Sequence, residues 1–295
     1  MSEKKTNKPK AGSVPTDLLK RNTVSTPILN GETLRDSDVV GTLTLVKFNE
    51  RIFLVTCNHV LRRWKDHGPL QSPIFEIETK KDEAPKKWLT VDLKRFNWGG
   101  LKTEDDEDDD GYYDLRVALL PKRENDHVIS SLILPISPAS EIDGQFTAVL
   151  TGFPEKKNTK DKIRKRKPTP WAKAWWYELF NEETPAPGKR IEFDWSHKTG
   201  NYMYEQQISE DSAKFVSTGS APPPFGTSGG PLIFLNSATA TDAIKHSVIG
   251  YGLEYDEERK KIIVGPSEAI IEIGLGLLKL EAESSYPTIY DPIYY

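Results

Sequence analysis

Short stretches in which apolar and polar residues alternate recur along this chain, and they predict β-strands. The first covers residues 40–46, and residues 52–56 return after a polar turn at 49–51, so the two predict a β-hairpin. Regular structure is expected to begin near Val39. Further strands are predicted in the apolar run after Asp114 and at 73–78, 87–93, 146–154, 190–195, 231–235, 247–252 and 262–264.

The carboxyl-terminal part changes to a helical pattern. Ser267 is placed to cap a helix and Glu268 lies in its first turn, so a helix is predicted to run to about Leu280. Many short strands, frequent turn signals and one terminal helix favour an all-β barrel or sandwich. Residues 1–30 begin with a lysine-rich segment that has no apolar period, and we expect them to form a flexible tail.

The composition limits the function classes. The chain has 295 residues, of which 28% are charged, yet its net charge is only −4, so no overall field favours nucleic acid or a membrane surface. Cys57 is the only cysteine, which rules out an intrachain disulfide and favours a reducing compartment. The polar amino terminus lacks a signal-peptide core, and no apolar run reaches the ~18 residues of a membrane span. We therefore expect a soluble, cytoplasmic protein.

Two blocks of opposite charge interrupt the strand pattern. Residues 104–110 are seven consecutive acids, and residues 156–167 include eight basic residues. Both blocks predict solvated loops. The basic run also leaves open a docking surface, a cleavable regulatory loop or phosphate binding. An aromatic segment follows it, and we interpret its tryptophans as core or lid packing: Trp171, Trp175 and Trp176.

The stretch most informative about chemistry is residues 225–232, in which Ser228 stands between glycines. Glycines permit a sharp turn and leave room for a substrate carbonyl. The amides of Gly226 and Ser228 can point inward together and stabilise a developing oxyanion. A serine hydroxyl is a weak nucleophile unless it has a neighbouring base that a third group orients. The competing interpretation of this stretch is a purely structural glycine turn.

A histidine and a carboxylate in suitable settings lie upstream of this turn. His59 follows the predicted strand at 52–56, where a strand end holds a base rigidly; the competing interpretation is a core histidine. Asp114 precedes a buried strand and is placed to accept an imidazole hydrogen bond, with Asp109 and Asp110 as alternatives. No metal site is predicted, because the other histidines show no ligand spacing: His67, His127, His197 and His246.

The motifs around His59, Asp114 and Ser228, in that order, resemble those of the trypsin/chymotrypsin-like serine peptidases. The resemblance covers about residues 39–267, and the Gly-Phe-Pro sequence at 152–154 is similar to a strand end of disulfide-free bacterial members. It implies two packed, six-stranded antiparallel β-barrels with the three residues in the cleft between them. The implied division is a first barrel at 31–140, a second barrel at 141–265, and a carboxyl-terminal helix and tail at 266–295.

The resemblance also implies the role of each residue. Ser228 attacks the scissile carbonyl, His59 accepts and returns the proton, and Asp114 orients the imidazole. The amides of Gly226 and Ser228 bind the oxyanion. The implied activity is that of a cofactor-free serine endopeptidase that acts on a protein or peptide substrate.

Three residues depart from the family pattern. Thr227 replaces the aspartate that precedes the serine in pancreatic-type enzymes, so activation by propeptide cleavage is not expected. Arg116 stands where alanine is usual and is free to pair with Asp114 or the acidic block. Cys57 replaces a small alanine; we expect a buried thiol there, not an alternative nucleophile.

The substrate-binding walls carry little charge. The residues before Ser228 include Pro222 but no acid, so a preference for lysine or arginine is not supported. Tyr251, Gly252 and Leu253 are expected on the opposite wall, which favours a small or apolar substrate side chain.

We interpret the chain as an endopeptidase with a restricted, regulatory role. The alternative is a catalytically silent barrel that recruits partners through its charged loops. We expect no binding to membranes or nucleic acid, and the oligomeric state is left open.

Overall fold

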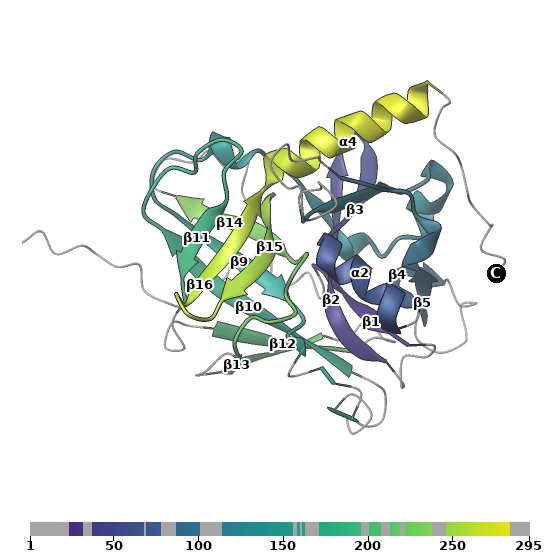
Figure 1. The fold of residues 1–295 in the computed structure, drawn as a ribbon, viewed down its shortest axis with the longest axis horizontal. Coiled ribbons are helices and arrows are strands. Elements are labelled where there is room, and N and C mark those ends of the chain that lie inside the picture. The colour runs from purple at the N-terminus through teal and green to yellow at the C-terminus, as the bar shows by residue number, and fades with distance from the viewer. Residues whose placement is uncertain are drawn as a thin grey trace, which may run out of the picture.

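The structure is a computed structural model. It describes residues 24–31, 37–67, 69–77, 87–100, 114–155, 158–159, 161–162, 171–195, 201–207, 213–218, 222–237 and 246–283. Two antiparallel sheets curl into half-barrels and pack side by side, and Figure 1 shows the yellow helix α4 running from the second sheet over the first.

The first sheet has the strand order β5-β4-β1-β2-β3-β7-β6, and β8 adds to β2 as a parallel neighbour. Strands β2 and β3 form the predicted hairpin. Asn49 and Glu50 make its two-residue turn, and both have positive φ, as the right-handed twist of a tight hairpin requires. The strands are β1 (Thr26–Asn30), β2 (Asp38–Phe48), β3 (Arg51–Thr56), β4 (Leu70–Ile77), β5 (Lys87–Asp92), β6 (Trp98–Gly99), β7 (Arg116–Leu119) and β8 (Ile133–Pro135).

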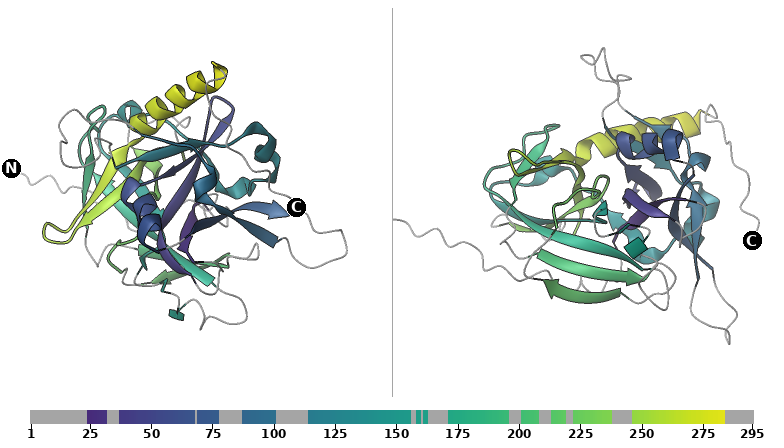
Figure 2. Two further views of the ribbon diagram at one scale, coloured as in Figure 1. Left: turned by 45° about the vertical axis from the view of Figure 1, so that its right-hand side comes forward. Right: turned by 60° about the horizontal axis from the view of Figure 1, so that its bottom comes forward.

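The second sheet has the order β11-β16-β15-β14-β9-β10-β12-β13. Its last three strands extend the sheet beyond β9, and Figure 2, right, shows them in green along one side of the molecule. The strands are β9 (Phe146–Gly152), β10 (Trp171–Asn181), β11 (Ile191–Asp194), β12 (Asn201–Gln207), β13 (Ala213–Thr218), β14 (Pro231–Ser237), β15 (Val248–Asp256) and β16 (Lys261–Pro266).

Among the described elements, α2 (Asn58–His67) follows β3 directly, and α4 (Ser267–Ala282) follows β16. Short 3-10 helices lie in the connections at Leu93–Arg95, Lys122–His127, Ser130–Leu132 and Ala139–Glu141. None of the helices in the described residues combines the length and the hydropathy needed to cross a bilayer.

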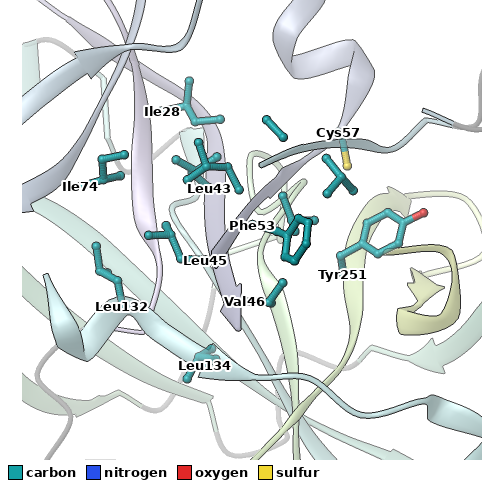
Figure 3. Packing of buried hydrophobic residues seen from close by; sticks show 14 of the residues in the cluster. Ile28, Leu43, Leu45, Val46, Phe53, Cys57, Ile74, Leu132, Leu134 and Tyr251 are labelled. Carbon is teal, nitrogen blue, oxygen red and sulfur yellow. The ribbon is translucent and has the colours of Figure 1, made fainter. Parts of the chain in front are cut away.

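The hydrophobic core is shared between the two sheets. One cluster joins the inside of the first sheet to the face of the second that packs against it, and Figure 3 shows Phe53 of β3 and Tyr251 of β15 within it. A separate cluster fills the inside of the second sheet. The shared cluster fixes the relative position of the sheets, because close-packed side chains leave no room for sliding.

These features confirm the expected chymotrypsin-like fold, with three differences in detail. Each sheet has eight strands in the described residues, not six, because short strands and the β12–β13 extension join the edges. Residues 26–30, expected to belong to a flexible tail, instead form β1, which buries Ile28 and Leu29. Residues 1–23 lie outside the described part.

The terminal helix is confirmed, but its amino terminus is built differently from the prediction. Pro266 is the capping residue and offers no side-chain hydrogen bond. Ser267 is already helical, and its hydroxyl donates to the carbonyl of Ser137 at 2.6 Å. The Glu268 carboxylate accepts from the amide of Ser140 at 2.7 Å. Both side chains therefore fasten the helix to the connection between the sheets.

Candidate active site

His59 lies in the first turn of α2, immediately after β3. The helix packs on β2 at Gly41, where a Cβ atom would lie only 2.5 Å from Val60 Cγ1. Cys57 and Val60, which flank His59 and Asn58, are fully buried, whereas 44% of the His59 side chain is exposed. The local sequence thus anchors the helix in the core and leaves the imidazole partly exposed.

Asp114 makes two hydrogen bonds with His59. Its Oδ1 accepts from the His59 amide at 2.8 Å, and its Oδ2 lies 2.6 Å from His59 Nδ1. A carboxylate only accepts, so Nδ1 carries the hydrogen and Nε2 keeps a free lone pair. The arrangement fits a general base whose tautomer and orientation are fixed.

Ser228 occupies a tight turn directly before β14. Gly226 and Gly229 on either side have φ values of +88° and +84°, a region in which residues with a Cβ atom are strained. The Thr227 amide donates to Pro224 at 3.1 Å, and the Gly230 amide donates back to Thr227 at 2.8 Å. These two hydrogen bonds therefore fix the backbone before and after Ser228.

The turn around Ser228 packs against the junction between β3 and α2. A Cβ atom on Gly229 would lie 2.9 Å from Cα of Thr56, three residues before His59. Gly252 of β15 connects the two regions, because its carbonyl accepts from the Gly229 amide at 2.8 Å and from Cys57 Sγ at 3.2 Å. In the part of the chain that the structure describes, no hydrogen bond joins Ser228 to His59; such bonds often tighten only when substrate binds.

Two amides of this turn have no hydrogen-bond acceptor among the described residues. The Phe225 carbonyl accepts from Glu155, and the Thr227 carbonyl accepts from Gly230. The N–H and C=O of a trans peptide point in opposite directions, so the amides of Gly226 and Ser228 point the other way. Among the described residues, no acceptor pairs with either amide. Two unpaired donors beside a serine are what oxyanion binding requires.

Thr227 and Arg116, which differ from the pattern expected from the sequence, both make hydrogen bonds to backbone carbonyls. Buried Thr227 donates its hydroxyl to the Pro224 carbonyl at 2.7 Å, which braces the turn from within. Arg116 Nη1 donates to the Leu115 carbonyl at 3.2 Å, and in the described residues no ion pair joins it to Asp114. The acidic block at 104–110, including the alternative acids Asp109 and Asp110, lies outside the described residues.

Cys57 is buried beside the histidine–aspartate pair. One ligand atom each from Cys57, His59 and Asp114 lies within 4.8 Å of the others. Burial, and then the Asp114 carboxylate, raise the pKa of the Cys57 thiol well above its usual value, and the thiol donates to Gly252. A protonated thiol and an Nδ1 already bonded to a carboxylate fit a hydrogen-bonded pair better than a metal centre, which needs a thiolate.

The residues expected to bind substrate are mostly enclosed. Tyr251 is fully buried against Gly265, so its side chain cannot contact a substrate. Leu253 and Pro222 are also buried, and the Pro222 carbonyl accepts from the Tyr177 hydroxyl at 3.3 Å. Gly252 lies next to the nucleophile turn, through its hydrogen bond with Gly229.

An aromatic contact that the sequence reasoning missed lies beside the turn. The ring of Phe225 meets that of Tyr255 edge-on with 5.2 Å between the ring centroids, and the ring of Trp195 also meets Tyr255 edge-on at 5.1 Å. The β-strand period could not have found Tyr255, because the register of β15 shifts between Gly252 and Glu254 and places Leu253 and Tyr255 in different clusters.

Comparisons with known proteins give only structural likenesses. No protein-family model matches the chain, and no curated protein matches it. The serine protease domain of the Sesbania mosaic virus polyprotein is 13% identical over 89% of this chain and 94% of that chain, with a TM-score of 0.37.

Two further solved structures are similar to the same extent. The HtrA-type protease AlgW with a decapeptide is 10% identical over 90% of this chain and 67% of that chain, with a TM-score of 0.42. A Glu endopeptidase in complex with MPD is 14% identical over 90% of this chain and 94% of that chain, with a TM-score of 0.41. Likenesses this distant do not identify an activity.

Proposed function

We propose that the protein is a serine endopeptidase in which Ser228, His59 and Asp114 act as a catalytic triad between the two sheets. The observation that carries the proposal is the pair of hydrogen bonds from His59 to Asp114, made beside a turn whose two unpaired amides flank Ser228. A core histidine would not explain the exposed imidazole, and a structural glycine turn would not explain two amides that have no acceptor among the described residues.

The chemistry follows from these positions. Ser228 Oγ attacks the substrate carbonyl while its proton passes to His59 Nε2, and Asp114 stabilises the imidazolium. The amides of Gly226 and Ser228 bind the oxyanion, each contributing about 3–4 kcal/mol to transition-state stabilisation. The proton then moves to the leaving amine as the C–N bond breaks. Water releases the acyl group by the same steps in reverse order.

The aromatic contacts of Tyr255 with Phe225 and Trp195 limit the size of the substrate side chain. Gly252 of strand β15 still bonds to Gly229 and Gly230, but beyond it the described residues offer β15 no partner on the side of β14, so this edge can pair with an extended peptide. The side chain before the scissile bond then points between this edge and the loop at 222–225. We infer that the rings of Phe225 and Tyr255, with Trp195 packed on Tyr255, occupy part of that space, which favours a small side chain there.

The turn needs no new amino terminus to become ordered. Pancreatic-type activation supplies an ion pair at the position of Thr227, and here the Thr227 hydroxyl bonds the Pro224 carbonyl instead. The amide of Glu155 holds Phe225 from outside the turn. We therefore infer that the folded chain is competent without proteolytic activation.

The test is active-site labelling with a fluorophosphonate, combined with hydrolysis of a peptide ester. Ser228→Ala is expected to abolish labelling, and Ser228→Ala or His59→Ala to lower the hydrolysis rate by about 10³-fold or more. Ser130→Ala is the matched control, because Ser130 is exposed in a 3-10 helix and contacts none of these residues.

Two results would contradict the proposal. Labelling that persists in Ser228→Ala would place the nucleophile elsewhere. A folded wild type that is not labelled and hydrolyses the ester no faster than His59→Ala would favour the silent binding module.

A further inference from the structure

Strand β2 carries two buried threonines that face the nucleophile turn. Thr42 and Thr44 are two residues apart, so both side chains point to the same face of the strand. The Thr44 hydroxyl donates to the Gly229 carbonyl at 2.7 Å. The amide of Thr42 donates to the Ser228 carbonyl at 3.0 Å, and its hydroxyl donates to the Gly226 carbonyl at 3.3 Å. The first sheet thus holds three carbonyls of a turn that belongs to the second.

The hydroxyl of Thr42 also connects to the loop that supports the turn from its other side. It accepts from the amide of Phe153 at 3.1 Å. Two residues further on, the amide of Glu155 donates to the Phe225 carbonyl at 2.9 Å, which is the bond that directs the Gly226 amide outward. The Thr42 hydroxyl therefore connects the turn that contains Gly226 to the loop at 153–155, and these two segments together set the direction of the Gly226 amide.

The remaining polar group of Thr42 is fixed as well. Its carbonyl accepts from the Thr56 hydroxyl at 3.0 Å, and Thr56 ends the strand that leads to His59. Thr42 is fully buried, so its own side chain cannot contact a substrate. Through four hydrogen bonds, its three polar groups connect the strand before His59, the turn around Ser228 and the supporting loop.

We propose that Thr42 is a positioning residue for the oxyanion-binding amides, acting through the carbonyl of Gly226 and the amide of Phe153. The inference rests on the proposed function and deepens it by naming the residue of the first sheet that orients donors in the second. Its effect belongs to the transition state, because an oxyanion forms only there.

The experiment compares Thr42→Val, Thr42→Ser and the matched control Thr26→Val. Valine keeps the shape of threonine but loses the hydroxyl, and serine keeps the hydroxyl. Thr26 is also fully buried; its hydroxyl donates to Pro73 at 2.8 Å and accepts from Ser72 at 3.3 Å, within the first sheet. Both valine variants lose stability, so stability alone does not distinguish the two sites.

Steady-state kinetics on a peptide ester distinguish them. Thr42→Val is expected to lower kcat by about 10- to 100-fold, less than the complete loss of an oxyanion donor, with KM unchanged. Thr42→Ser restores kcat, and Thr26→Val leaves it unchanged. The pH profile of Thr42→Val matches that of the wild type, because the His59–Asp114 pair is untouched.

Backbone ¹⁵N relaxation gives a readout that does not depend on turnover. The amides of Gly226 and Ser228 are expected to gain mobility in Thr42→Val and not in Thr26→Val. An active wild type together with an equally active Thr42→Val, or an equal loss of kcat in Thr26→Val, would overturn this inference alone. A wild type without turnover would overturn the proposed function and this inference with it.

Discussion

Gly226 and Gly229 of the turn around Ser228 cannot be substituted without a clash. A Cβ atom on Gly226 would lie 2.6 Å from the amide nitrogen of Glu155, and one on Gly229 would lie 2.3 Å from the carbonyl oxygen of Thr42. Both contacts are with backbone, which cannot move aside as a flexible side chain does. Any substitution at either glycine therefore displaces the hydrogen bonds that direct the oxyanion-binding amides.

We also expect a single residue, Tyr255, to limit the size of the substrate side chain before the scissile bond. Tyr255→Ala removes the ring that lies between Phe225 and Trp195 and opens space beside the turn. We expect cleavage after leucine or phenylalanine to rise by about 10-fold or more relative to cleavage after alanine, since one to several methylenes gain room. A peptide library with one varied position measures this ratio.

The control for this prediction is Phe180→Ala, which removes an aromatic ring of β10 that is 42% exposed. The control should leave the ratio as in the wild type. A Tyr255→Ala variant with an unchanged preference would show that the rings do not border the substrate.

At the scale of elements, helix α2 positions His59, the proposed general base. The sequence pattern predicted the β3 strand before His59 but not the helix after it. Residues 58–67 are mostly polar, and the apolar period is too short to recognise. The helix forms because Val60 packs into the space that Gly41 of β2 leaves open, and that space exists only in the folded sheet.

Gly41→Ala tests this packing. The added methyl group meets Val60, whose branched side chain has few rotamers in a helix, so α2 must shift. We expect a loss of about 1–3 kcal/mol in the free energy of unfolding, together with a fall in ester hydrolysis as His59 moves.

Chemical denaturation and steady-state kinetics measure these two effects. Gly276→Ala is the control, because nothing lies within 4 Å of its added Cβ, and alanine there should stabilise α4 slightly. If Gly41→Ala kept both full stability and full activity, α2 would not depend on that close approach.

At the scale of the whole molecule, α4 fastens the two sheets together. The helix begins directly after β16 of the second sheet and packs on the first, where Ile273 lies against Gly99 and Gly274 lies against the Phe53 ring. Near its end, Glu281 pairs with the buried guanidinium of Arg51, which also donates to the Leu120 carbonyl at 3.1 Å. With the shared core, these contacts couple the folding of the two sheets.

Ile273→Ala tests the coupling. Loss of this buried side chain is expected to cost about 2–4 kcal/mol of unfolding free energy, by removing apolar contacts and leaving a cavity. Native-state hydrogen exchange should then show protection lost to the same extent in β2 and β3 as in β14 and β15. A loss confined to the first sheet would mean that the two sheets unfold independently.

Much of the fold was predictable because strand signals are local. The hairpin of β2 and β3, the strands around residues 146–152 and 231–237, and the terminal helix all follow from patterns within a few residues. Strand β1 and the long strand β10 were missed, because a short apolar run and an aromatic cluster do not by themselves distinguish a strand from a loop. Their partners in β2 and β9 decide the matter.

The candidate site likewise has a part that was predictable from local sequence and a part that was not. The residue types and their order along the chain predict a nucleophile, a base and an acid, because each sits in a recognisable short motif. The direction of the Gly226 and Ser228 amides, the role of Thr42 and the rings around Tyr255 depend on contacts between the two sheets. Side chains that meet across packed sheets carry no shared period in the sequence, so the chain determined the reacting groups and only the tertiary structure determined their alignment.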